Sequence, residues 1–172
     1  VIVNPLALRV FDSANAELPL SSTGFSYDTA SNTAKWTLAA ALVRNKYLIS
    51  LDASLISDTD TVPAALDGEW TTSTTTYATS GNGSPGGDLN FRFNYLPGDV
   101  TRNGQTNAGD ANLTRSLGTV VPDPTNYWRD VTGNNQINAG DANYVASLGT
   151  LSLSGYVEPT NPPDPRQTLL AT

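Results

Sequence analysis

Cysteine, histidine and methionine are absent from this chain of 172 residues. Their absence excludes disulfide bonds, thiolate or imidazole metal ligands, and any nucleophile activated by histidine. Zinc enzymes and serine hydrolases are therefore poor candidates, and no other pairing of a nucleophile with a base stands out in the sequence. We predict that the protein is not an enzyme.

Long apolar runs and positive charge are also scarce. No stretch approaches the roughly 20 apolar residues of a bilayer-spanning helix, and no basic segment followed by an apolar one opens the chain. Since the chain starts at Val1, we interpret it as a mature or excised piece. Sixteen acidic against nine basic residues give a net charge of -7. Because an acidic surface repels phosphates and anionic lipids, we expect no nucleic acid and no membrane insertion, but we do expect a cation.

Residues 1–96 are predicted to form an antiparallel β-sandwich with an immunoglobulin-like outline. Short segments alternate apolar and polar residues at a period of two, and turn-forming clusters separate them. The predicted strands cover residues 6–12, 24–28, 33–38, 46–53 and 89–95. The apolar faces are expected to be Tyr47, Ile49 and Leu51 on one strand and Leu89, Phe91, Phe93 and Tyr95 on another, with Trp36 in the core.

A glycine-rich loop, SGNGSPGGD (80–88), precedes the last of these strands. A phosphate site needs the start of a helix behind such a loop, so we predict a hairpin connection instead. The acids near it are expected to be solvated, with a further metal site involving Asp67 or Asp88 as the alternative. The acids in this group are Asp52, Asp58, Asp60, Asp67, Glu69 and Asp88.

The strongest pattern is a duplication in the second half of the chain. DVTRNGQTNAGD (99–110) returns as DVTGNNQINAGD (130–141), and residues 99–119 and 130–150 are identical at 15 of 21 positions. Chance agreement would give about one or two. The pattern changes at LPGD (96–99), which predicts that a module of residues 97–151 follows the sandwich.

Each copy opens with a 12-residue loop that carries oxygen donors at positions 1, 3, 5, 7, 9 and 12, the spacing that wraps calcium. The predicted ligands of the two calcium ions are Asp99, Thr101, Asn103, Gln105, Asn107 and Asp110, and then Asp130, Thr132, Asn134, Gln136, Asn138 and Asp141. The two glutamines would use their main-chain carbonyls. Such hard, irregularly spaced oxygen donors favour calcium over magnesium. Hydrogen-bonded Asx turns without a metal are the alternative.

Two loop positions carry conformational predictions. Position 6 needs a left-handed backbone, and it holds Gly104 in the first loop and Asn135 in the second, the two residue types that tolerate this conformation best. Position 8, occupied by Thr106 and Ile137, is expected to form a short β bridge between the loops.

A short helix is predicted after each loop, over residues 111–119 and 142–150, with glycines near the ends as stops. A calcium loop followed by one helix, used twice, resembles the type I dockerin family. The resemblance covers residues 98–151 and depends on the repeated DVTxNxQxNAGDAN motif. It implies a calcium-stabilised module that binds another protein, either cohesin-like or a second copy.

Positions 10 and 11 help dockerins choose their partner, and here they are Ala108–Gly109 and Ala139–Gly140, without hydroxyls.

The LDGEW (66–70) and GGDLNFRFNYLPGD (86–99) runs resemble the immunoglobulin-like domain that precedes such modules in large secreted bacterial proteins of planctomycete type. This second resemblance implies an extracellular or cell-surface location.

Residues 152–172 form a proline-rich tail that is expected to be extended, and to lie on the sandwich or on a neighbouring molecule.

The leading prediction for the function of the chain is a non-catalytic, calcium-binding assembly module. One alternative is a structural subunit of an extracellular fibre, a homo-polymer joined by exchange of terminal strands. The other is a carbohydrate-binding module of a secreted enzyme, with Trp70 and Trp128 stacking on sugars rather than serving as buried anchors.

Overall fold

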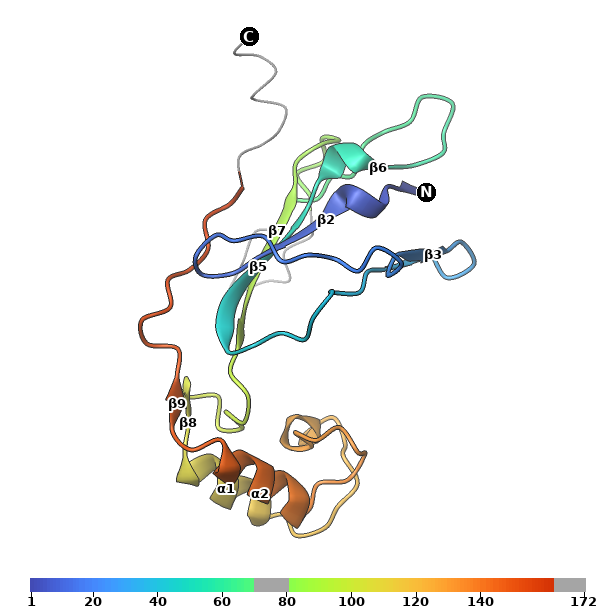
Figure 1. Cartoon of the computed structure of the whole chain (residues 1–172). Helices are drawn as coiled ribbons and strands as arrows, with labels where there is room; N and C mark the ends of the chain where they lie inside the picture. The colour runs from blue at the N-terminus through green and yellow to red at the C-terminus, as the bar shows by residue number, and fades with distance from the viewer. Residues whose placement is uncertain (70–80, 163–172) are drawn as a thin grey trace. The chain divides into compact units, whose positions relative to one another are not determined.

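The structure is a computed structural model that describes residues 1–69 and 81–162. It is mainly β with two α-helices, as the sequence predicts, and its sheets are antiparallel (Figure 1). The chain divides into two compact units. The first contains residues 1–41, 46–93 and the segment from 157 onward, and the second contains residues 42–45 and 94–156.

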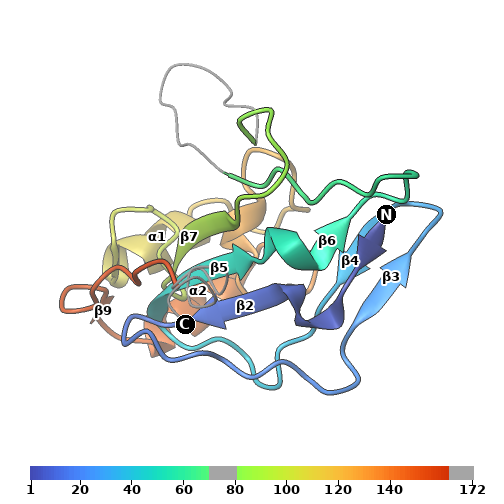
Figure 2. The ribbon, with the colours of Figure 1, turned by 90° about the horizontal axis from the view of Figure 1, so that it is seen from above.

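The first unit is built on a three-stranded sheet in the order β2–β5–β7 (Figure 2). Its strands are β2 (Leu8–Phe11), β5 (Asn45–Leu51) and β7 (Leu89–Tyr95). Two smaller pairs accompany it, β1 (Ile2–Val3) with β6 (Ile56–Ser57) and β3 (Ser26–Asp28) with β4 (Thr33–Lys35). Single-turn 3-10 helices, η1 (Pro5–Ala7) and η2 (Ala53–Leu55), precede β2 and β6.

Burial in β5 differs from the predicted alternation. Tyr47 is buried as expected, but Leu48 and Ser50, which point the other way, are buried as well, and Ile49 is only half-buried. β5 is the central strand of its sheet, and the burial of side chains that point to opposite sides shows that both of its faces are covered. Tyr47 stacks on Phe93 with ring centroids 5.4 Å apart.

The edge elements are more exposed than the sequence suggested. On β7, which is an edge strand, Phe91 and Tyr95 are exposed. Trp36 is half-buried and not part of the core; its ring lies 5.2 Å from Phe25, and its Nε1–H donates to the carbonyl of Pro5 at 2.8 Å. An indole that must reach a main-chain acceptor near the surface stays partly in contact with water.

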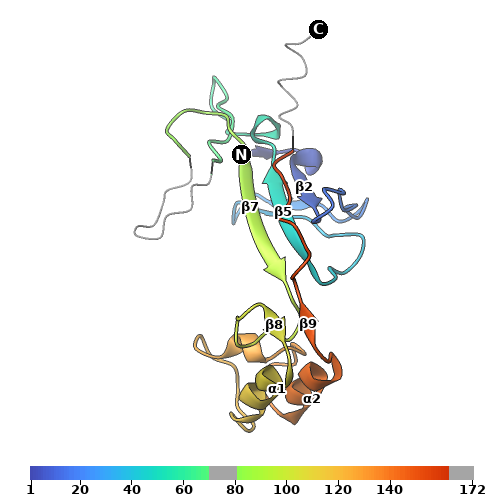
Figure 3. The ribbon, with the colours of Figure 1, turned by 90° about the vertical axis from the view of Figure 1, so that its left-hand side faces the viewer.

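Residues 157–162, here called the strap, pack back on the first unit (Figure 3). Pro159 is fully buried, and its carbonyl accepts a hydrogen bond from Arg92 of β7 at 2.9 Å. Glu158 forms an ion pair with Lys46 of β5 at 2.7 Å, and the main-chain N–H of Thr160 donates to the side chain of Asn15. Of the two predicted positions of the tail, these residues take the first, and residues 163–172 lie outside the described part.

The second unit packs α1 (Ala108–Arg115) against α2 (Ala139–Ser147), and a 3-10 turn, η3 (Tyr127–Arg129), lies between them in sequence. Each helix begins three residues before its predicted start. The last three positions of each loop already have helical backbone, because the asparagine at position 9 caps the helix. The sequence pattern predicts only loop roles for these positions, an ion ligand at position 12 and a partner-selecting pair at positions 10 and 11.

The two repeats interlock, but not as predicted. The expected bridge between Thr106 and Ile137 is wrong for the described residues. Thr106 in β8 (Gln105–Thr106) pairs instead with Leu151 in β9 (Leu151–Ser152), and Ile137 pairs with Val120. The residue at position 8 of each loop therefore forms a β pair with a residue that lies just after the helix of the other repeat. Each repeat completes its partner's backbone hydrogen bonding.

Equivalent residues of the repeats form one small core. The buried pairs are Thr106 and Ile137, Asp110 and Asp141, Ala111 and Ala142, and Thr114 and Val145. Two of these pairs match a threonine with an aliphatic side chain of similar shape. Each threonine hydroxyl finds a main-chain acceptor, Thr106 on Pro97 at 2.6 Å and Thr114 on Asp110 at 3.0 Å, which makes its burial tolerable.

Candidate metal centre

The carboxylate at position 12 closes the first loop. Asp110 is completely buried, and its Oδ1 accepts hydrogen bonds from the main-chain N–H of Thr101 at 2.9 Å and from the Thr101 hydroxyl at 2.8 Å. Its Oδ2 accepts the N–H of Asn107 at 2.9 Å. These bonds tie positions 3, 9 and 12 together, so Asp110 is both a loop clamp and the first acid of α1.

The carboxylate at position 1 holds the turn of the same loop. Asp99 accepts the N–H of Asn103 through Oδ1 at 3.0 Å and the N–H of Gly104 through Oδ2 at 2.8 Å. Its Oδ1 also lies 3.3 Å from the Thr101 hydroxyl. The structure thus brings together the side-chain oxygens of positions 1, 3 and 12, as the calcium prediction requires.

The hydroxyl of Thr101 faces two acceptors with a single hydrogen. It donates that hydrogen to Asp110, the closer oxygen, which leaves Asp99 Oδ1 facing an oxygen without a hydrogen between them. Asp99 keeps a free lone pair on each oxygen and Asp110 keeps one on Oδ2. Converging oxygen lone pairs, three of them on the two carboxylates, are the environment that a hard cation stabilises.

The second loop repeats the hydrogen bonds that the first makes to its position-12 carboxylate and to its position-1 carboxylate in the turn. Asp141 is buried and accepts the N–H and hydroxyl of Thr132 at 3.1 and 2.8 Å, and the N–H of Asn138 at 2.9 Å. Burial raises the pKa of Asp141, but the hydrogen bonds from Asn138 and Thr132 outweigh it, so that the pKa lies below its ordinary value. Asp130 accepts the N–H of Asn134 at 3.1 Å.

The remaining predicted ligands have local structural roles. The side chains of Asn103 and Asn134 accept the N–H of Gln105 and Gln136, each at 2.9 Å. Asn107 and Asn138 are the N-caps of α1 and α2, accepting the N–H groups of Gly109 and Gly140 at 2.7 and 2.6 Å. Position 9 is therefore committed first to the helix. Since this position often reaches an ion through water, the helix cap leaves room for an indirect contact.

Replacement of the cap should have a modest effect. Asn107→Ala or Asn138→Ala removes the capping oxygen, and we expect each to lower the free energy of unfolding by about 1 kcal/mol. Urea unfolding of the full chain measures this loss. Asn107→Asp is the matched variant, because it keeps an oxygen at the cap and should restore most of the stability; equal losses in both variants would contradict the capping role.

Backbone conformation supports the loop assignment at position 6, where Gly104 and Asn135 have φ of +83° and +62°. Sequence reasoning missed position 4, where Arg102 and Gly133 are also left-handed, with φ of +59° and +68°. The glycine in the second copy was the available signal. The guanidinium of Arg102 lies over the ring of Trp128, 4.0 Å from its centroid.

Trp128 is half-buried and lies against the first loop. Its Nε1–H donates at 3.1 Å to the carbonyl of Val100, the residue between Asp99 and Thr101. Because the indole N–H is bonded to the first loop and Arg102 covers one face of the ring, Trp128 serves as an anchor for this loop. Trp70, the other residue considered for sugar stacking, lies outside the described residues.

Comparison with known proteins adds no relative. Neither family models, nor curated proteins, nor solved structures gave a match to this chain.

Within residues 1–69 and 81–162, no helix has the length and apolar character needed to cross a membrane. In the same residues, no three acidic side chains gather in one metal-binding group. A loop site would therefore depend on two carboxylates supplemented by hydroxyl, amide and carbonyl oxygens.

Proposed function

We propose that the second unit is a non-catalytic calcium-binding assembly module that works outside the cell, with one ion in each loop. The observation that carries this proposal is the convergence of Asp99, Thr101 and Asp110 around a hydroxyl that has one hydrogen for two carboxylate oxygens. The clamp on Asp110 recurs at Asp141. Calcium would stabilise the unit by linkage, since it binds only where the folded loop gathers these oxygens.

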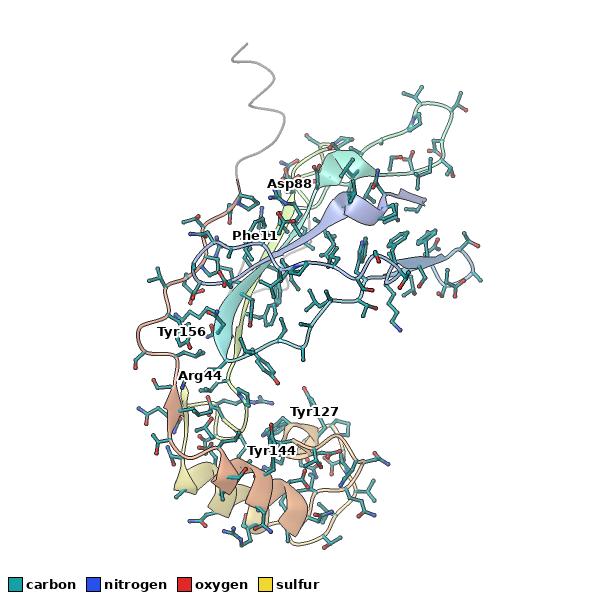
Figure 4. The ribbon with its side chains drawn as sticks, in the orientation of Figure 1. Phe11, Arg44, Asp88, Tyr127, Tyr144 and Tyr156 are labelled. Carbon is teal, nitrogen blue, oxygen red and sulfur yellow. The ribbon has the colours of Figure 1, made fainter. Side chains whose placement is uncertain are left out.

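The proposal includes the finer assignment of fold. We propose an immunoglobulin-like sandwich for the first unit, supported by its antiparallel sheets, and a dockerin-like pair of loop–helix repeats for the second, supported by the matched loops. The helices leave Asn112 and Arg115 on α1, and Tyr144 and Ser147 on α2, exposed to solvent. Tyr144 is labelled in Figure 4. We propose that this surface receives another protein, cohesin-like or a second copy.

Terbium luminescence tests the calcium sites directly. Because Trp128 contacts the first loop, excitation of its ring should sensitise a terbium ion bound there, and calcium should suppress the emission by competition. Trp128→Phe should sharply reduce the sensitised emission; because it also removes the hydrogen bond to Val100, it should weaken calcium binding slightly without abolishing it. The Asp99→Asn/Asp130→Asn double variant should lose both. Emission that survives in the double variant, or none in the unaltered protein, would remove the loops as ion sites.

A second candidate function is favoured by the strap. An extended end that buries Pro159 and pairs Glu158 with Lys46 makes contacts that the same segment of another molecule could also make. Exchange of such ends is a general route to polymers. Light scattering of the purified chain, with electron microscopy of native material, separates the two functions: filaments support a fibre subunit, and dispersed monomers support the assembly module.

A further inference from the structure

β2, an outer strand of the main sheet in the first unit (Figure 2), is paired along only part of its outer edge. The chain turns back after β2 and meets it at one bridge, between Phe11 and Glu17. Next to this bridge, the N–H of Leu18 donates to the carbonyl of Val10 at 2.7 Å. The returning segment therefore begins to pair with β2 as an added strand would.

The returning segment then leaves β2 for a different partner. Leu20 forms a bridge with Leu38, and the N–H of Ser21 donates to the carbonyl of Thr37 at 2.8 Å. Within residues 1–69 and 81–162, no hydrogen bond joins Leu20 to β2. The two segments thus separate after Leu18.

The separation leaves the outer edge of β2 unpaired at Leu8. The carbonyl of Ala7 accepts the N–H of Asp52 at 2.9 Å, on the β5 side, whereas the carbonyl of Val10 faces the returning segment. Because the main-chain groups of successive strand residues alternate between the two edges, those of Leu8 face the same side as those of Val10. In the described part of the chain, no hydrogen bond uses them on this side. An unpaired strand edge can take up an added strand.

A groove lined mainly by leucines lies at this edge. Its volume is about 590 Å³, and its apolar lining consists of Leu6, Leu8, Leu18, Pro19 and Leu20. Arg9 and Glu17 complete the lining, and they form an ion pair with each other at 2.7 Å. This groove, called the β2 groove below, therefore offers an apolar surface without an unpaired charge, which fits an uncharged apolar segment.

Residues 163–172, PDPRQTLLAT, contain such a segment. Six uncharged residues in succession, QTLLAT (167–172), include the adjacent Leu169 and Leu170. Ten extended residues span at most about 33–36 Å, which is enough to carry these leucines to a neighbouring molecule. Contact between leucine side chains is favourable because it removes apolar surface from water.

The strap leads this segment away from the β2 groove of its own chain. The N–H of Thr160 donates to the side chain of Asn15, in the turn after β2, and the next residue, Asn161, accepts a hydrogen bond from Arg92 of β7. β7 is the outer strand on the opposite side of the sheet from β2. The chain therefore leaves the strap on the side of β7, which favours a groove on a second copy.

We propose that residues 163–172 of one copy bind in the β2 groove of a second copy, with Leu169 and Leu170 among the groove leucines and the main chain added to the edge of β2. This inference rests on the second candidate function, a subunit joined through its terminal segments, and it identifies the two surfaces that join. Because each copy carries one such segment and one groove, the contact is heterologous and continues from copy to copy.

Sedimentation velocity of the full chain at increasing concentration tests this assembly. The unaltered chain should form species larger than the monomer. Leu6→Asp, which places a charge in the groove, and Leu169→Asp/Leu170→Asp, which places charges in the segment, should each lose all of these species. A mixture of the two variants in equal amounts should form dimers and nothing larger, because one variant supplies an intact segment and the other an intact groove.

Val62→Asp is the matched control. Leu6 and Val62 are 74% and 82% exposed in the same unit, so an aspartate at either position disturbs little packing, but only Leu6 lines the groove. Val62→Asp should therefore assemble like the unaltered chain. If the unaltered chain assembles, then assembly that survives in Leu6→Asp, or a mixture that stays monomeric, would overturn this inference alone. An unaltered chain that is monomeric at every concentration would overturn the fibre function with it.

Discussion

Removal of calcium is expected to lower the melting temperature of the second unit by about 20–40 °C. An ion at 100 times its dissociation constant stabilises the folded state by about 2.7 kcal/mol, so two loops contribute about 5 kcal/mol. For a unit of this size, each kcal/mol corresponds to about 4–8 °C. In a Trp36→Phe/Trp70→Phe background, where Trp128 is the remaining tryptophan, fluorescence during heating with and without a calcium chelator measures the shift in the unit that holds the loops.

Two controls make this result specific. Magnesium added in place of calcium should recover little of the loss, because it demands a tighter octahedral geometry than the loops offer. The Asp99→Asn/Asp130→Asn variant should melt near the temperature of the chelated protein and show no further response to chelator. If the melting temperature of the unaltered protein does not change when calcium is removed, the loops are hydrogen-bonded turns without a metal.

Asp110→Asn and Asp141→Asn are each expected to cost about 3–5 kcal/mol, even without calcium. Asp110 accepts three hydrogen bonds in complete burial. An asparagine keeps one acceptor oxygen, but its amide nitrogen then faces the N–H of Asn107, donor against donor. The loss of a bond to a charged group, at about 1.5–3 kcal/mol, adds to the cost of a buried unpaired donor, at about 1–3 kcal/mol.

Asp123 offers a matched control in the same unit. Like Asp110, it accepts the N–H and hydroxyl of a threonine, Thr125, at 2.7 and 2.6 Å, but it is exposed. Asp123→Asn should therefore cost less than 1 kcal/mol, in the range of surface substitutions. Urea unfolding in the presence of chelator compares the three variants. If Asp110→Asn and Asp123→Asn lower the free energy of unfolding equally, the burial of Asp110 does not add to the stability that its hydrogen bonds provide.

The candidate site was largely readable from the sequence. The donor spacing of each loop identified Asp99, Thr101 and Asp110, which the structure brings together. Binding of calcium by them stays a prediction. The spacing also placed glycine or asparagine at position 6, which is left-handed in both loops. These features are local, since every hydrogen bond within a loop joins residues no more than nine positions apart.

The start of each helix was missed for a related reason. Asn107 and Asn138 have two possible uses, as an ion ligand and as a cap, and the sequence pattern fits both. The structure shows the capping hydrogen bond in each repeat. The spacing of donors alone cannot distinguish these uses, because both need a side-chain oxygen at the same position.

The sequence by itself determined the mainly β character, the duplicated loops and the existence of a helix after each, because neighbours along the chain specify them. Only the tertiary structure decided which strand is buried on both faces, that Thr106 pairs with Leu151 rather than with Ile137, and that Asp67 accepts main-chain hydrogen bonds from Asn82 and Gly83. Such contacts join residues far apart in the chain. Their stability comes from packing and desolvation in the folded state, which no local pattern encodes.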